Sequence, residues 1–378
     1  MCKLTLSPGI CYLFIRFLNS LCIMFQLRFE NQVFSKIDDF ERFTPDFPEF
    51  AKTAFAFCKA WLAGEQTFSQ ATSGSTGTPK QISISRQQME ASAKATGAFF
   101  KTDSRSKLLC CLNPAYIAGK MMLVRAMVWD CEVILTEPSA DPIQKIDREI
   151  DFIAMVPLQV QACMDDEESC QKLKKINHLI IGGAPISAKL KFSLIEKGIQ
   201  AWQTFGMTET VSHIALAPIT SQELTYQVLP GVQFGKDNRG ALWIKSEMSG
   251  PEPIQTNDLI ELRSDSSFVW LGRVDFVINS GGIKIHPELL EARIEHLLQL
   301  YFPDSLFFIF GEKDEKLGEK VMLLIESKFG EEKQAGELQN ALKASLKKYE
   351  VPKGIYFLPS FLMTPSGKIN RAQTQSLV

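Results

Sequence analysis

Short apolar runs alternate with amphipathic stretches between residues 105 and 200 of the chain. Runs of about four to eight apolar residues are typical of buried strands, whereas apolar positions three or four residues apart are typical of helices. The strand-like runs cover residues 107–112, 131–136, 152–156 and 178–181, and the helix-like stretches cover 118–129 and 188–197. Strands that alternate with helices indicate an α/β domain.

After residue 201 the pattern changes to shorter strand-like runs separated by Gly, Pro, Asn and Asp, including 240–244, 259–262 and 268–271. These runs predict a β-rich subdomain. A further unit begins near Arg273, where residues 287–300 have an amphipathic pattern and strand-like runs follow at 305–310 and 320–325. We therefore predict an amino-terminal core over 24–272 and a small α+β unit over 273–378, with the boundary at 272–275.

The first residues need a separate interpretation, because 10–25 is apolar apart from Arg16 and Asn19. This stretch is too short to cross a bilayer, and no small-x-small cleavage pattern precedes the polar run that starts at Glu30. Export stays an alternative, but we expect residues 1–23 to be either an apolar extension or a segment upstream of a true translation start at Met24. In both cases we predict no stable membrane insertion.

The composition is typical of a soluble globular enzyme, since 45% of the 378 residues are hydrophobic and 22% are charged. A formal net charge of -2 without any Lys or Arg run does not provide the basic surface of a nucleic-acid-binding protein. The nine cysteines show no Cys-x-x-Cys spacing, which predicts reduced thiols in a cytoplasmic protein. The four histidines show no metal-ligand spacing, so we expect no structural metal.

The strongest local signal for chemistry is a run of small and hydroxyl residues that ends in Pro79 and Lys80. Its members are Thr72, Ser73, Gly74, Ser75, Thr76, Gly77 and Thr78. Glycines let the backbone curl around an anion, hydroxyls donate to phosphate oxygens, and the lysine adds positive charge. The spacing differs from that of P-loop NTPases, which argues against a kinase or a GTPase. The run predicts a phosphate-binding loop, with a Ser/Gly linker as the alternative.

A second signal follows the apolar run that ends at Trp202, and its sequence is Thr204-Phe205-Gly206-Met207-Thr208-Glu209-Thr210. An aromatic ring before a glycine can stack on a purine, a threonine can bind phosphate, and a carboxylate can hold Mg²⁺. A polar turn after an ordinary strand would look the same.

Two further signals lie in the carboxyl-terminal unit. One is Gly272-Arg273-Val274-Asp275 with the later Ser280-Gly281-Gly282-Ile283-Lys284. The double glycine permits close passage of an extended ligand or an ordinary hairpin turn, and the arginine can reach phosphate or ribose oxygens. The other is Thr364-Pro365-Ser366-Gly367-Lys368, although a lone lysine there would ordinarily be a solvated surface charge.

These four signals, in this order, resemble the adenylate-forming superfamily, which includes acyl-CoA synthetases, adenylation domains of peptide synthetases and luciferases. The resemblance runs from about Gln70 to Arg371. It implies a large amino-terminal domain with a mobile carboxyl-terminal lid. It also implies an ATP- and Mg²⁺-dependent ligase that activates a carboxylic acid as an acyl-adenylate and transfers the acyl group to coenzyme A. A catalytically silent nucleotide-binding member and a stand-alone enzyme that loads a carrier protein are alternatives.

The resemblance implies a role for each matching residue. Lys368 would be the lid lysine that serves adenylation, Thr208 and Glu209 would bind phosphate and Mg²⁺, and Asp275 would be the hinge. The remaining ligand contacts would come from the loop 72–80, from Gly183 and Ala184 in the adenine pocket 182–185, from Phe205 and Gly206 beside the base, from Asp258 at the ribose, from Arg273 at ribose or phosphate, and from Gly281, Gly282 and Lys284 along the thiol channel.

Three positions depart from the pattern of the superfamily. Phe205 stands where Tyr is common, Asn257 replaces the usual Gly beside Asp258, and Phe276 replaces an acidic residue after the hinge. None of them removes a charge that the chemistry requires, and the retained charged residues argue against a silent member.

The segment 112–122 and the length of about seventy residues before the phosphate loop are similar to compact o-succinylbenzoate:CoA ligases of menaquinone biosynthesis. That substrate carries a second carboxylate. Tyr116, Lys120 and His213 are candidate substrate contacts, although a helix-start lysine and a core histidine are equally good interpretations of the last two. A ligase for another aryl or short-chain acid is the alternative.

Overall fold

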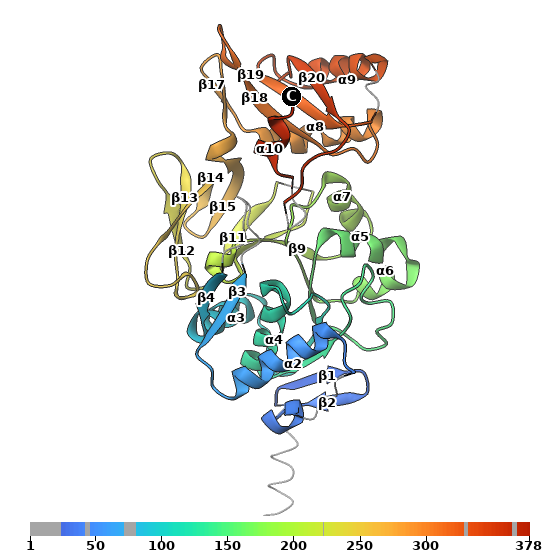
Figure 1. Cartoon of the computed structure of the whole chain (residues 1–378), viewed down its shortest axis with the longest axis vertical. Coiled ribbons are helices and arrows are strands. Elements are labelled where there is room, and N and C mark those ends of the chain that lie inside the picture. Colours follow the sequence, from blue (N-terminus) through green and yellow to red (C-terminus); the bar gives the residue numbers. More distant parts are fainter. Residues whose placement is uncertain (1–23, 42–45, 72–80, 222, 329–331, 365–368) are drawn as a thin grey trace, which may run out of the picture.

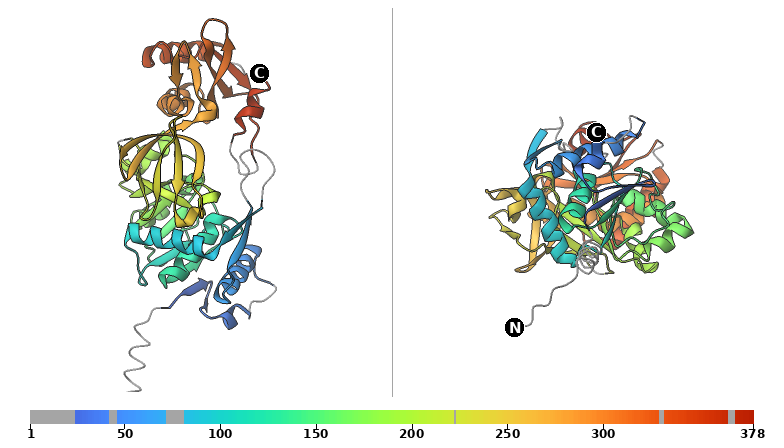
Figure 2. Two further views of the ribbon diagram at one scale, coloured as in Figure 1. Left: turned by 90° about the vertical axis from the view of Figure 1, so that its left-hand side faces the viewer. Right: turned by 90° about the horizontal axis from the view of Figure 1, so that it is seen from below.

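The computed structural model describes residues 24–41, 46–71, 81–221, 223–328, 332–364 and 369–378. The chain forms two units stacked end to end (Figures 1 and 2), each with its own sheet. It passes from the first unit to the second between Arg273 and Ile278, and the expected hinge Asp275 lies in this connection, within η4 (Val274–Phe276). The predicted extension 1–23 lies outside the described residues.

The first half of the large sheet is parallel. Six of its strands run in one direction, and one antiparallel strand closes the edge. In spatial order they are β9 (Ala201–Gly206), β8 (His178–Ile181), β7 (Phe152–Met155), β5 (Lys107–Cys110), β6 (Glu132–Leu135), β1 (Gln26–Phe29) and the edge strand β2 (Gln32–Phe34).

The second half of the large sheet is antiparallel and continues from β9. In spatial order its strands are β10 (His213–Pro218), β11 (Thr225–Val228), β15 (Ser267–Arg273), β14 (Ile254–Ser264), β13 (Ala241–Lys245) and β12 (Gln233–Lys236). The predicted β-rich subdomain is therefore hydrogen-bonded to the α/β part through the β9–β10 ladder. A separate ribbon joins β3 (Thr67–Ala71) to β4 (Gln81–Ser85).

Helices cover both faces of the parallel strands, because strand side chains alternate between two hydrophobic clusters. Leu108 and Phe152 face one cluster with α2 (Glu49–Leu62), α3 (Arg86–Phe100) and α4 (Ile117–Trp129). Leu109 and Ile153 face the other, with α5 (Pro157–Asp165), α6 (Glu167–Leu173) and α7 (Ala188–Glu196). Short 3₁₀ helices lie at η1 (Ile37–Glu41), η2 (Thr208–Thr210) and η3 (Glu247–Ser249).

The carboxyl-terminal unit contains a five-stranded sheet with its own core. Its strands are β16 (Ile278–Ser280), β17 (Ile283–Ile285), β18 (Phe307–Asp314), β19 (Gly318–Glu326) and β20 (Gly354–Leu358), and its helices are α8 (Pro287–Tyr301), α9 (Glu332–Ser345) and α10 (Arg371–Gln375). None of the helices in the described part of the chain is long and apolar enough to span a membrane.

Two carboxylates on α8 contact the first unit. Glu295 Oε2 accepts a 2.8 Å hydrogen bond from the backbone N–H of Ala188, which is an otherwise unpaired donor at the start of α7. Glu288 packs on Gly272 of β15, where a Cβ atom would lie 2.5 Å from Glu288 Oε2. Seven residues separate the two side chains, which places them on one face of the helix.

We predict that the Glu288→Gln variant loses part of the pH dependence of stability. Burial raises the pKa of Glu288 from 4.5 to about 7, an effect that nearby Arg371 opposes. The folded protein therefore favours the protonated carboxyl, and this contribution, present below pH 4.5, is lost as the pH rises through about 7. A shift of this size corresponds to roughly 3 kcal/mol. The melting temperature at pH 5 and at pH 8 measures this loss. Between pH 5 and pH 8 the melting temperature of the wild type should fall further than that of Glu288→Gln. The exposed Glu315→Gln variant is the control, and equal losses in all three proteins would contradict the prediction.

Candidate active site

The loop after β8 and the turn after β9 lie side by side at one edge of the sheet. These two strands are parallel neighbours, so their carboxyl ends face the same crevice, where open α/β sheets bind ligands. The Gln203 side-chain amide donates to the carbonyl of Ala184 at 3.3 Å and ties the loop to β9. Gly183 and Ala184 are exposed at this edge.

Two glycines allow the loop to approach β9 closely. A Cβ atom on Gly182 would lie 2.3 Å from Thr204 Oγ1, far inside van der Waals contact. Gly183 has a φ of +83°, which a residue with a side chain rarely adopts. The predicted adenine-pocket residues are thus held against the strand that carries the second motif.

The turn after β9 presents Glu209 to solvent. The Thr210 hydroxyl donates to the Ser212 carbonyl at 2.7 Å and accepts from the backbone N–H of Met207 at 3.1 Å, which fixes the turn. Val211 has a φ of +64°, a costly conformation for a β-branched residue that this packing imposes. The Glu209 side chain is exposed and forms no ion pair with any described residue.

Phe205 lies at the junction between the two halves of the sheet. Its ring meets Tyr226 edge-to-face at a centroid distance of 5.5 Å and Phe268 at 5.3 Å. Such contacts orient an aromatic ring, and Phe205 keeps part of its surface accessible. The neighbouring Gly206 packs on the Ser212 carbonyl, 2.3 Å from where a Cβ atom would stand, so no side chain fits there.

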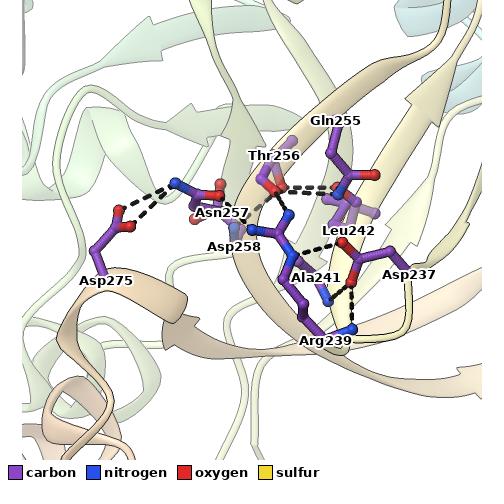
Figure 3. A network of polar contacts seen from close by, with 9 residues as sticks. All are labelled: Asp237, Arg239, Ala241, Leu242, Gln255, Thr256, Asn257, Asp258 and Asp275. Carbon is purple, nitrogen blue, oxygen red and sulfur yellow. Dashed lines mark hydrogen bonds and ion pairs between the residues drawn. The ribbon is translucent and has the colours of Figure 1, made fainter.

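Asp258 and Arg273 face each other across the β14–β15 ladder. The indole N–H of Trp270 donates to Asp258 Oδ1 at 3.0 Å, which holds the carboxylate in place. Arg273 Nη2 donates to Asp275 Oδ2 at 2.8 Å. The structure thus brings together the expected ribose ligand, the expected phosphate ligand and the expected hinge residue, and Figure 3 shows the polar network around Asp258 and Asp275.

The expected thiol-channel residues lie at a different place. Gly281 and Gly282 have φ values of +59° and +81° and form the turn between β16 and β17, so this motif is a hairpin in the structure. In Figure 1, β17 lies at the side of the carboxyl-terminal unit and farther from the first unit than α10, which lies on the side that faces the first unit. Ser280 is buried, and Lys284 is exposed on the hairpin.

Several predicted residues lie outside the described part of the chain. They are Thr72, Ser73, Gly74, Ser75, Thr76, Gly77 and Lys80 of the phosphate loop, and Lys368 of the lid. The residues that flank them are paired: Ala71 with Gln81, and Met363 with Ile369. Their roles stay predictions.

The three expected substrate contacts differ in their surroundings. Tyr116 is 68% exposed and precedes α4. Lys120 donates from Nζ to Gln70 Oε1 at 2.8 Å, and burial lowers its pKa. His213 is buried, with its two ring nitrogens 3.2 Å from the Thr96 hydroxyl and 3.3 Å from the Ser212 hydroxyl. Burial, and then the charge of Arg125, lower the pKa of His213 well below its usual value, so His213 is neutral near pH 7.

Arg125 is a candidate functional residue that our sequence interpretation missed. It is 1% exposed within α4, donates from Nη2 to the Ser212 hydroxyl at 3.1 Å, and forms no ion pair with the described residues. Its Nε finds no hydrogen-bond partner within the described ranges. Burial lowers its pKa to about 10, so it stays charged at pH 7. A lone arginine inside the apolar run 121–129 was the available signal.

The site fits Mg²⁺ only together with a phosphate ligand. No group of three or more His, Cys, Asp or Glu side chains in the described ranges could hold a metal. Mg²⁺ usually keeps several waters and binds through one or two carboxylates plus substrate phosphates. The single exposed carboxylate of Glu209 suits that mode of binding.

The chain is similar to known proteins in sequence and in fold. The model of the AMP-binding enzyme family matches residues 60–234. The crystal structure of an acyl-CoA synthetase (AMP-forming)/AMP-acid ligase II-like protein from Dyadobacter fermentans is similar to this chain, with a TM-score of 0.61. The two sequences are 37% identical, and the match covers 91% of this chain and 99% of that one.

Two further relatives are more distant. The 2-succinylbenzoate–CoA ligase of Enterococcus faecalis is 25% identical over 79% of this chain and 67% of its own length. The structure of o-succinylbenzoate coenzyme A synthetase from Bacillus subtilis, in complex with ATP and magnesium ion, matches this chain with a TM-score of 0.67. The two sequences are 23% identical, and the match covers 81% of this chain and 69% of that one. The second comparison shows likeness of fold.

We predict that Gly182→Ala weakens ATP binding at least about tenfold, because the added methyl group would push the loop off Thr204. Isothermal titration with ATP measures the change. The double variant Gly182→Ala/Thr204→Ala removes the clashing hydroxyl and should recover most of the affinity. Unchanged binding in the single variant, or no recovery in the double variant, would show that this close approach does not shape the pocket.

Proposed function

This chain belongs to the AMP-binding enzyme family of AMP-forming acyl-CoA synthetases, and we propose that it joins a carboxylic acid to coenzyme A through an acyl-adenylate. The pairing of Asp258 with Arg273 beside the connection between the two units is the observation that carries this proposal. In this proposal the Asp258 carboxylate would bind the ribose and the Arg273 guanidinium would bind phosphate, from adjacent strands.

The reaction needs two displacements because a carboxylate is a poor electrophile. In the first, a carboxylate oxygen attacks the α-phosphorus of ATP and pyrophosphate leaves. In the second, the thiol sulfur of coenzyme A attacks the acyl carbon, AMP leaves and the thiol proton is lost. Arg273 and Lys368 would stabilise the charge that develops on the phosphate oxygens, each by about a hundredfold in rate. Mg²⁺, held at Glu209, would supply charge neutralisation on the triphosphate.

The two displacements would use two arrangements of the carboxyl-terminal unit. In the structure Gly281 and Gly282 form the turn between β16 and β17, and Figure 1 places β17 on the carboxyl-terminal unit, well away from β9 of the first unit. Rotation at Asp275 would bring this hairpin toward the site for the second displacement. The present arrangement therefore serves the first displacement in this proposal.

We propose o-succinylbenzoate as the acid, which would place the enzyme in menaquinone biosynthesis. The curated relatives named 2-succinylbenzoate–CoA ligase support this choice at about a quarter identity. We also place the enzyme in the cytoplasm, where the six described cysteines would stay reduced; all six are free and buried.

We propose Arg125 as the cation that binds the second carboxylate of this acid. It contacts Ser212, whose carbonyl packs on Gly206 at the end of β9, so the guanidinium lies directly behind the second motif. A buried guanidinium without an acidic partner is costly, and a substrate carboxylate would pair with it. Lys120 is less suited because its amine is already bonded to Gln70 and the Ser69 carbonyl. Neutral His213 can contribute a hydrogen bond only.

We expect ATP–pyrophosphate exchange with o-succinylbenzoate to exceed exchange with benzoate, succinate and short-chain acids by at least about a hundredfold. The reason is that benzoate and the short-chain monocarboxylic acids lack a second carboxylate to pair with Arg125, and succinate lacks the aromatic ring that separates the two carboxylates of o-succinylbenzoate. Exchange rates over the panel measure the preference. Faster exchange with another acid would refute the substrate and keep the reaction class, whereas no exchange with any acid would refute the proposed reaction.

We predict that Arg125→Met raises the KM for o-succinylbenzoate by between about tenfold and about a hundredfold, the usual range for losing a hydrogen bond to a charged group. The KM for ATP should change less, because Arg125 contacts Ser212 and is not itself among the residues expected to bind ATP. Steady-state kinetics with Lys120→Met as the matched control separate the two candidate cations. A larger effect in the lysine variant would reassign the carboxylate partner.

A further inference from the structure

Asn257 holds the carboxylate of the connecting segment. Its side-chain amide nitrogen donates to both oxygens of Asp275, at 3.1 Å and 3.3 Å (Figure 3). Asn257 belongs to β14 of the first unit, and Asp275 lies in η4, after the last strand of the large sheet. This contact therefore joins the body of the first unit to the segment in which the two units part.

The orientation of the Asn257 amide is set from the other side. Arg239 Nη1 donates to Asn257 Oδ1 at 3.3 Å, so the amide oxygen is occupied and the amide nitrogen is directed toward Asp275. Arg239 is itself held by Asp237, whose Oδ2 accepts from Nε at 2.8 Å. The turn between β12 and β13 thus positions Asn257 through a chain of charge-assisted hydrogen bonds.

Asp275 has a second partner on the large sheet. Arg273 donates to Asp275 Oδ2 at 2.8 Å, so one carboxylate is held by an arginine of β15 and an amide of β14. Both bonds depend on the direction in which the Asp275 side chain leaves the backbone. A rotation of the second unit that changes φ of residue 275 turns that side chain relative to the first unit, so the two bonds cannot both persist.

We propose that Asn257 is a positioning residue that holds the connecting segment in the present arrangement and so favours the first displacement over the second. The inference rests on the proposed function, because it assigns the two arrangements to the two displacements. Glycine, the usual residue at this position in the superfamily, has no side chain to make the contact. This chain therefore carries a restraint on unit rotation that the common pattern lacks.

The test compares the two half-reactions in one set of proteins. ATP–pyrophosphate exchange with the preferred acid reports the first, and thioester formation from supplied acyl-adenylate and coenzyme A reports the second. Asn257→Ala should lower the exchange rate by about threefold to tenfold, the equivalent of one ordinary hydrogen bond, and should leave thioester formation equal or faster. Asn257→Asp should lower exchange further, because it places a second negative charge against Asp275.

Gln255→Ala is the matched control. Gln255 lies on the same strand and in the same polar network, but it donates to the Leu242 and Thr256 carbonyls and does not contact Asp275. The ratio of the two half-reactions should stay at the wild-type value in this control. An unchanged ratio in Asn257→Ala, or an equal loss of both half-reactions, would overturn the proposal.

A second measurement does not depend on activity. Trypsin cleavage after Arg273 reports how often the connecting segment leaves the body of the first unit. Asn257→Ala should be cleaved about threefold to tenfold faster than wild type and Gln255→Ala at the wild-type rate. Equal cleavage rates would count against the restraint even in a preparation without ligase activity. Absence of exchange in wild type with every acid would instead refute the proposed function.

Discussion

The arrangement of the site depends on β9, because this strand is parallel to β8 on one side and antiparallel to β10 on the other. Its carboxyl end therefore belongs both to the crevice of an α/β sheet and to the start of an antiparallel sheet. The register shifts between His213 and Ala215, where Gly206 pairs with His213. This irregularity lets the chain turn tightly through η2, which exposes Glu209 and leaves Ser212 in contact with Arg125.

Local pattern predicted the four strands β5 to β8 of the parallel half but not β1, β2 or β9, because strands buried on both faces are continuous apolar runs. The predicted runs at 152–156 and 178–181 are β7 and β8, and the predicted helix at 287–300 is α8. The strand predicted at 259–262 is too short, because β14 spans Ile254–Ser264. The first part of this strand carries Thr256, Asn257 and Asp258, whose side chains are committed to hydrogen bonds, so apolar periodicity does not reveal it.

The positions of site residues could be predicted from the sequence only where a short local motif determines the backbone conformation. Gly182 and Gly206 are required by close backbone approaches, and glycine in a motif signals such approaches. The facing of Asp258 and Arg273 depends on a ladder whose register shifts at Leu259 and Ile260, and no sequence pattern encodes that register. Arg125 was missed because we interpreted 118–129 as an amphipathic helix, in which an arginine belongs to the solvent-facing side, whereas α4 is buried almost all round.

The contacts between the units explain why rotation can be inexpensive while each unit stays folded. Within the described residues, two apolar clusters belong to the first unit and two to the second, and none includes residues of both. The units meet instead through polar contacts, such as Glu295 with the Ala188 N–H and Glu288 against Gly272. Water can replace a hydrogen bond at a net cost of about 1 kcal/mol, whereas opening either core would expose apolar surface at about 25 cal/mol per Å². A few polar side chains around Asp275 therefore strongly influence which arrangement of the two units is populated.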